Sequence, residues 1–164
     1  VFFQKKQERP IYFNQSGLVL FFLNDENEIV FFTQTMLGDE RSRQDKKSLI
    51  QPMIAIETLY NTNELRFGEE ITKVEIGFHS RVPLADGVQV FVPAWKITVN
   101  DERNYFVNAI EGFVFSSHEN EFLEDIMTHD LERIKEHLPE SDLRDFVVTF
   151  ITEKLAATNR GGQS

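Results

Sequence analysis

Two apolar runs separated by a short acidic turn form the clearest hydrophobic pattern in the chain. They cover residues 90–99 and 105–112, and the turn between them covers 100–102. Two strand-like runs joined by a short polar turn predict a β-hairpin. Its first arm carries the only tryptophan, Trp95, which we expect at the centre of the packing. Pro93 lies in the same arm, and because proline lacks an N–H it predicts an edge position or a bulge.

The N-terminal third of the chain alternates short apolar segments with polar turns. Residues 1–9 are polar and are expected to be a lead-in. The apolar segments that follow cover 10–13, 18–23 and 29–36. Their short polar connections predict a three-stranded meander.

The segment 18–23 is apolar at every position. An antiparallel strand with one wet face should alternate, so both faces of this strand should be covered. The C-terminal helices could supply the cover. Alternatively, a partner protein binds an exposed aromatic patch. The candidate partner-binding residues are then Phe21, Phe22, Phe31 and Phe32.

A helix and a long strand are predicted ahead of the central hairpin. The apolar positions at helical spacing are Leu49, Met53, Ile56 and Tyr60. Proline is tolerated only in the first turn, so Pro52 places the start of the helix near Gln51. The strand covers 71–82, and His79 falls on its polar side, where we expect a solvated surface histidine.

After residue 116 the chain becomes acidic and amphipathic. Apolar positions recur with a helical period at 122–138 and again at 143–155. Pro139 breaks the first helix, and Ser141 is a suitable N-cap for the second. These elements predict an α+β fold with an antiparallel sheet of about five to six strands, a packed helix and a C-terminal helical hairpin. The predicted domains are residues 1–116 and a helical extension, 117–164, packed on the first.

Composition and charge narrow the range of functions. The 164 residues carry a formal net charge of −10, include 16 phenylalanines and lack cysteine. Binding to nucleic acid or to an anionic membrane surface needs clustered cations, so both are disfavoured. Without cysteine there is no disulfide scaffold and no thiolate metal site. The chain begins at Val1 without an initiator methionine, and we expect a targeting segment upstream.

No catalytic constellation stands out in the sequence. Gly-x-Ser-x-Gly and His-Glu-x-x-His are both missing. Asp125 and His129 are one helical turn apart and could share a surface metal ion, although a solvated helix face explains them better. Residues 24–28 lack the central glycine and the closing glutamate of a calcium loop, so we expect a plain hairpin turn. We therefore predict no enzyme activity, no catalytic residue, no cofactor and no metal site.

Two separated motifs resemble the YycI proteins of low-GC Gram-positive bacteria. The first is Phe13-Asn-Gln-Ser-Gly-Leu-Val-Leu-Phe-Phe-Leu-Asn-Asp-Glu-Asn-Glu-Ile-Val30, continued by Thr33-Gln-Thr-Met-Leu37. The second joins Val92-Pro-Ala-Trp-Lys-Ile97 to Tyr105-Phe-Val-Asn-Ala-Ile-Glu-Gly112. The order of elements over 52–115 is also similar to PepSY-type modules, which close with a similar hairpin. The resemblance covers roughly residues 8–116 and leaves out the C-terminal helices.

The YycI resemblance implies a regulator that is not an enzyme. Such proteins are anchored by one N-terminal transmembrane helix, and their folded part lies outside the cell. Together with the related YycH they bind the YycG (WalK) sensor kinase and adjust the YycFG system, which governs cell-wall metabolism. The resemblance thus implies an extracytoplasmic domain, a membrane anchor upstream of Val1, a kinase and a YycH-like protein as partners, and either a homodimer or a heterodimer.

Two other functions stay open at this point. The PepSY-like order of elements would fit an inhibitor or chaperone of a secreted peptidase. A metal-dependent hydrolase has the least support, because the sequence offers only the Asp125 and His129 pair as ligands.

Overall fold

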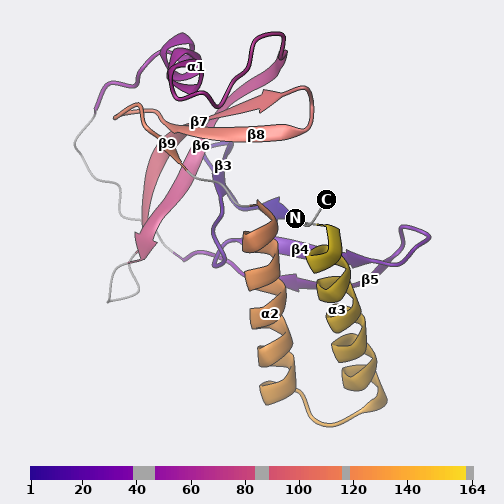
Figure 1. Cartoon of the computed structure of the whole chain (residues 1–164). Coiled ribbons are helices and arrows are strands. Elements are labelled where there is room, and N and C mark those ends of the chain that lie inside the picture. The colour runs from indigo at the N-terminus through magenta and orange to yellow at the C-terminus, as the bar shows by residue number, and fades with distance from the viewer. Residues whose placement is uncertain (39–46, 84–88, 116–118, 162–164) are drawn as a thin grey trace. The chain divides into compact units, whose positions relative to one another are not determined.

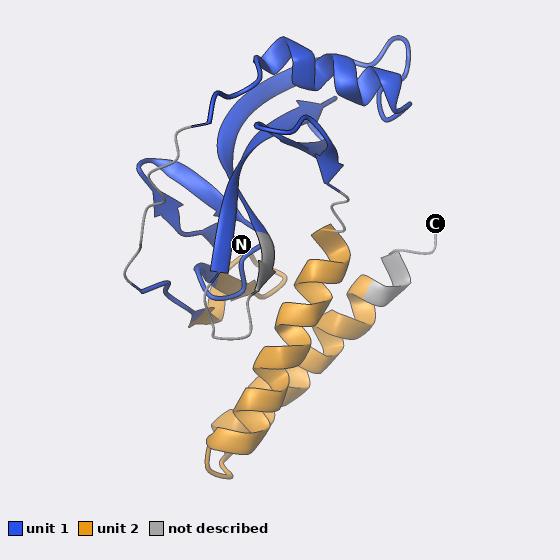
Figure 2. Cartoon of the chain, turned by 90° about the vertical axis from the view of Figure 1, so that its left-hand side faces the viewer, with its two compact units in different colours: residues 1–19, 34–117 blue, residues 20–33, 118–164 orange. Residues whose placement is uncertain are grey.

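The computed structural model describes residues 1–38, 47–83, 89–115 and 119–161 (Figure 1). They form two compact units, shown in different colours in Figure 2. Unit 1 comprises 1–19 and 34–117, and unit 2 comprises 20–33 and 118–164. Strands, a packed helix and a C-terminal helical pair confirm the predicted α+β class. Within the described ranges, no helix has the length and apolar character needed to cross a bilayer.

Unit 1 is built on a six-stranded sheet. In order across the sheet, its strands are β2 (Lys5–Lys6), β3 (Arg9–Tyr12), β6 (Ile71–Pro83), β7 (Gln89–Val99), β8 (Arg103–Asn108) and β9 (Val114–Phe115). Neighbouring strands are antiparallel except for β3, which pairs with β6 in parallel. Helix α1 (Pro52–Asn61) contributes to the core of this unit.

The predicted central hairpin is confirmed as β7 and β8. Trp95 lies opposite Ile76 of β6 and Val107 of β8. The connection from Val99 to Arg103 has three residues, and its first two, Asn100 and Asp101, have positive φ values of 53° and 59°, as in the tight turns that join hairpin strands. The Trp95 side chain is partly buried against the core, and its indole N–H donates to the carbonyl of Ile50 at 3.0 Å.

The prediction of an edge position for Pro93 holds locally, because this residue pairs with β6 alone, but it does not hold for the strand as a whole. β7 lies between β6 and β8, so it is not an edge strand. The register shifts between β6 and β7 fall next to Ile71 and Ser80, away from Pro93. Pairing with β8 begins one residue later, at Ala94, and the Pro93 carbonyl accepts a hydrogen bond from the Ala109 N–H at 2.8 Å. The proline is tolerated because it stands just beyond the end of that ladder.

Helix α1 begins where it was predicted, with Gln51 at its N-cap and Pro52 in its first turn. The side chains that pack on the sheet, however, are Ala55 and Leu59, which are fully buried. Met53 and Tyr60, which belong to the apolar stripe that predicted the helix, are instead largely exposed. The helix is therefore apolar on two faces, and only one of them is used by the core.

The N-terminal predictions need two corrections. Residues 1–9 are not a lead-in, because they contain β1 (Phe2–Phe3), β2 and the first residue of β3. The predicted meander is also wrong: β3 joins the six-stranded sheet, whereas β1, β4 (Leu18–Leu23) and β5 (Ile29–Gln34) form a sheet of their own. Phe13 has a positive φ of 54°, so the chain turns sharply between β3 and β4.

Unit 2 combines residues 20–33 of the β4–β5 hairpin with α2 (Glu119–His137) and α3 (Asp142–Gly161). The break at Pro139 and the N-cap at Ser141 are confirmed, because the Ser141 Oγ accepts from the Arg144 N–H at 3.2 Å. The buried apolar side chains of the two helices are Ile126, Met127, Val147 and Ile151. Leu143 and Phe146, which fall in the predicted apolar positions, are exposed.

Candidate interaction surfaces

A hollow of about 500 Å³ lies in unit 1 between α1 and the segment that leads into β6. Its apolar lining residues are Met53, Ile56, Tyr60, Leu65, Phe67 and Ile71. We call this surface the α1 groove. Concave, mainly apolar surfaces of this size are typical of binding sites.

Three of the groove's apolar side chains are mostly in water. The exposed fraction is 70% for Met53, 60% for Tyr60 and 99% for Phe67. Phe67 stands on a turn that starts at Arg66, where the Glu69 N–H donates to the Arg66 carbonyl at 3.3 Å. Gly68 supplies the positive φ, 90°, that lets the chain reverse at this point.

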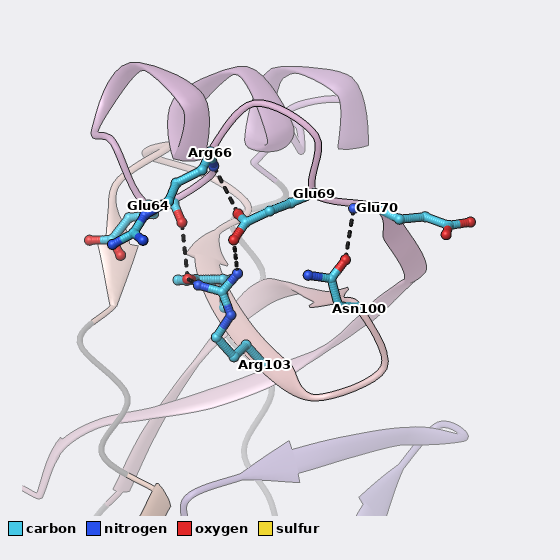
Figure 3. Close-up of polar contacts among 7 residues, drawn as sticks. Glu64, Arg66, Glu69, Glu70, Asn100 and Arg103 are labelled. Atoms are coloured by element: carbon cyan, nitrogen blue, oxygen red, sulfur yellow. Dashed lines mark hydrogen bonds and ion pairs between the residues drawn. The ribbon is translucent and has the colours of Figure 1, made fainter. Parts of the chain in front are cut away.

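Polar contacts fasten the Phe67 turn to the end of the sheet (Figure 3). A Glu69 carboxylate oxygen accepts from the backbone N–H of Arg66 at 2.8 Å. The other oxygen pairs with the guanidinium of Arg103, on β8. That guanidinium also donates to the Tyr105 hydroxyl at 2.9 Å, and the hydroxyl donates to the Glu64 carbonyl at 3.0 Å.

Two further hydrogen bonds hold the end of the same segment. The Glu70 N–H donates to the Asn100 side-chain oxygen at 2.9 Å (Figure 3). The Asn100 N–H donates to the Glu70 carbonyl at 2.8 Å. The pKa of Glu69 is below its usual value, mainly because its carboxylate accepts the hydrogen bond from the Arg66 N–H and, to a smaller extent, because Arg103 is close. Glu69 is thus ionised near neutral pH, and its contacts with Arg66 and Arg103 hold the turn in place.

The groove was not anticipated from the sequence. The helical spacing of Met53, Ile56 and Tyr60 predicts a face that packs on the core, and the sequence does not show that α1 packs mainly through other residues. One feature of the sequence could have indicated it. Phe67 lies in the charged turn Arg66-Phe-Gly-Glu69, and charged residues are rarely buried, so an aromatic side chain between them should be exposed.

The four predicted partner-binding phenylalanines form two pairs within unit 2. Phe22 is buried and stacks on Phe31, with ring centroids 4.2 Å apart. Phe31 also meets the ring of Phe150, from α3, at 6.1 Å. Phe21 pairs with Phe32 at 5.7 Å, and Phe32 is 56% exposed. Of the four, Phe32 alone is largely exposed, so it is the one best placed to contact a partner.

The C-terminal helices also make polar contacts with the β4–β5 hairpin. The Thr33 hydroxyl donates to the buried carboxylate of Asp130, on α2, at 2.6 Å. The ammonium of Lys154, on α3, lies 3.8 Å from the Asp25 carboxylate. Within unit 2 the helices therefore cover one face of the hairpin, as one of the two explanations for its apolar character predicted.

His79 is not a solvated surface histidine, so that prediction is wrong. Its ring stacks on Phe115 at 4.1 Å and 2°, and it also meets the rings of Phe13 and Phe106. Burial lowers the pKa of His79 below 6.5. Nδ1 lies 2.8 Å from the Ser80 carbonyl oxygen, whereas Nε2 is buried without a hydrogen-bond partner among the described residues. The ring is thus held neutral as part of an aromatic cluster.

The two segments considered for metal binding have ordinary surroundings. Asp125 and His129 are exposed on α2, and no group of three potential ligands occurs among the described residues. The predicted hairpin turn at 24–28 is confirmed. The Asn24 side-chain oxygen accepts from the N–H groups of Glu26 and Glu28, and Asn27 has a positive φ of 62°.

The Asn108–Gly112 motif closes the second arm of the central hairpin. Asn108 is buried, and its side-chain oxygen accepts from the N–H groups of Ile110 and Glu111 at 2.8 and 2.9 Å. Gly112 adopts a φ of 77° and donates to the Asn108 carbonyl. The motif is therefore a side-chain-capped turn, which gives it a structural role.

Comparison with known families identifies the chain over most of its length. The family model described as YycI protein matches residues 1–110, which include the α1 groove and the whole central hairpin and end before α2. No curated protein matches the sequence. Because the matched segment is well over half of the chain, the protein belongs to the YycI family, a regulatory family of the YycFG (WalKR) system.

Proposed function

We propose that this chain is the extracytoplasmic part of a membrane-anchored regulator that binds the YycG sensor kinase together with a YycH-like protein. In doing so it adjusts the output of the YycFG system. The observation that carries the proposal is the family match over residues 1–110. The chain's action in this role is binding, and it needs no catalytic residue.

The surfaces of the two units support a binding role. Unit 1 displays the α1 groove with Met53, Tyr60 and Phe67 in water, and unit 2 displays Phe32. Exposed apolar clusters of this kind are typical of protein–protein contact sites. The net charge of −10 disfavours attraction to anionic lipid, so contact with proteins is the better use of these surfaces.

The direct test is reconstitution of the signalling step. The kinase would be placed in proteoliposomes with the full-length form of this protein, the YycH-like protein, both or neither. We expect the purified extracytoplasmic regions to bind one another and the rate of response-regulator phosphorylation to change when both proteins are present. Unchanged phosphorylation together with no detectable binding would refute the proposal.

The compartment can be tested separately because the chain has no cysteine. Glu102, in the exposed turn of the central hairpin, can be replaced by cysteine in the full-length protein. A membrane-impermeant maleimide added to intact cells should label Glu102→Cys. Labelling only after the cells are lysed would place the domain inside and contradict the proposal.

A further inference from the structure

We propose that the α1 groove is the docking site for a short apolar segment, flanked by Lys or Arg, on one of the chain's protein partners. The inference rests on the proposed function. It adds which surface of this chain contacts the partner and which kind of partner segment binds there. Three observations carry it: the unused apolar face of α1, the fastened turn that displays Phe67, and the charge around the groove.

The first observation is that α1 has more apolar surface than its own core needs. Ala55 and Leu59 alone are the fully buried positions that anchor it to the sheet. A second stripe, formed by Met53, Ile56 and Tyr60, lines the groove; Ile56 is partly buried against the core, whereas Met53 and Tyr60 are largely exposed. A surface helix needs only one apolar face for folding. The core therefore does not account for Met53 and Tyr60, and both suit contact surfaces because they are large and adaptable.

The second observation is the placement of Phe67. Its ring is 99% exposed, yet the turn beneath it is held by Glu69, Arg103 and Asn100. A preformed turn reduces the entropy lost on binding, because the ring is already positioned. Exposed aromatic side chains next to a hollow are typical of the few residues that dominate the affinity of a protein interface. Phe67 is the side chain that we expect to be buried most by the partner.

The third observation is the sign of the charge. Carboxylates line the groove at Glu57 and Glu69, and Glu64 and Glu70 are next to lining residues in the chain. The cations in the same region are Arg66 and Arg103, and Arg103 is engaged by Glu69. Among the described residues, Glu57, Glu64 and Glu70 form no ion pair. A basic segment would be attracted to this surface, whereas an acidic one would be repelled.

The test compares variants of the whole 164-residue chain in binding to the purified extracytoplasmic regions of the kinase and of the YycH-like protein. Phe67→Ala removes the displayed ring, and Ile54→Ala is the matched control, because Ile54 is an exposed apolar residue of α1 that does not line the groove. We expect Phe67→Ala to raise the Kd for one partner by about thirtyfold or more. Ile54→Ala should leave the Kd within about twofold.

The charge argument has its own pair of variants. Glu57→Lys reverses a charge that lines the groove, and Glu8→Lys makes the same change at an exposed site in β2–β3 that does not line it. We expect only Glu57→Lys to weaken binding, and we expect that difference to shrink at high salt. Overlapping peptides from the partner regions then identify the segment, which should pair apolar residues with Lys or Arg.

The outcomes separate the two proposals. If the wild-type chain binds its partners and Phe67→Ala binds them equally well, the groove is not the docking site, while the proposed function stands. If the wild-type chain binds neither region, the proposed function fails. If the 164-residue chain associates with itself and Phe67→Ala abolishes this association, the groove binds a second copy and the inference is overturned. The inference is also overturned if the peptides that bind best are acidic or purely apolar.

Discussion

The replacement Trp95→Ala tests whether the central hairpin organises the packing of unit 1. The indole contacts the core formed by α1 and the sheet, and its N–H donates to the carbonyl of Ile50 at 3.0 Å. The N–H of Ile50 in turn donates to the Ala109 carbonyl at 2.8 Å. Trp95 and Ala109 thus fix Ile50, the residue before the N-cap of α1, so losing the indole should loosen the start of the helix as well as the sheet.

The size of the effect follows from the burial and the hydrogen bond. A partly buried tryptophan removes about 150 Å² from water. At about 25 cal/mol per Å² this contributes about 4 kcal/mol, of which the alanine methyl retains a small share. The lost hydrogen bond adds about 1 kcal/mol. We therefore expect Trp95→Ala to lower the free energy of unfolding of unit 1 by about 4 kcal/mol, within the usual range for Trp→Ala at packed positions.

Urea unfolding followed by circular dichroism measures this change, and amide exchange along β7 and β8 shows that it falls in unit 1. Trp95→Phe keeps most of the apolar area but removes the donor to Ile50, so we expect a loss of only about 1–2 kcal/mol. In the wild-type chain the fluorescence should be that of a shielded indole. A loss below about 1 kcal/mol for Trp95→Ala, or an emission spectrum typical of an indole in water, would refute the reasoning.

Three further changes probe other contacts. Gly77→Ala would place a Cβ against the ring of Tyr12, and we expect a loss of about 1–3 kcal/mol in urea unfolding. Burial lowers the pKa of His79 below the 6.5 of an unfolded histidine, so on acidification the unfolded chain takes up this proton first. The free energy of unfolding should therefore fall as the pH drops from about 6.5 toward the lowered pKa, and urea titrations over this range should show a weaker dependence for His79→Phe. Asp130→Ala removes the acceptor of the Thr33 hydroxyl and should destabilise unit 2 by about 1–3 kcal/mol in thermal unfolding, whereas Asp130→Asn, which keeps an acceptor, should lose less.

Local patterns in the sequence predicted the local elements well. The β7–β8 hairpin follows from two strand-like runs around Asn100 and Asp101, whose side chains tolerate a positive φ. The start of α1 follows from Pro52, and the break between α2 and α3 follows from Pro139 and Ser141. In each case the residues that decide the structure are neighbours in the chain.

The errors arise where distant segments meet. The pairing of β3 with β6 joins Ile11 to Phe78, and such a contact leaves no periodic trace in either segment. The alternation of polar and apolar residues along β6 predicted that His79 is solvated, but the rings of Phe13 and Phe115, from other parts of the chain, pack against it. Periodicity cannot reveal which partner covers a side chain, because the cover comes from tertiary packing.

The α1 groove is a second feature that periodicity alone does not predict. The sequence indicated a helix with an apolar stripe, and this was correct. Which stripe packs on the sheet depends on the position of Ala55 and Leu59 against the core, which only the folded structure provides. Once they are seen to be buried, the exposed Met53 and Tyr60 change from expected core residues to candidates for contact with a partner.

The C-terminal helices lie beyond the YycI match, yet they complete a hairpin that lies inside it. Among the described strands, the hairpin is extended only by β1, a strand of two residues, and so small a sheet needs a partner for its apolar face. Here the partner is the helical pair: Phe31 meets Phe150, and Thr33 donates to Asp130. Phe22 stacks on Phe31 beneath this cover. A YycI protein without equivalent helices would have to cover the position of Phe31 in another way, so the residues outside the match determine whether this face of the hairpin is closed or open to a partner.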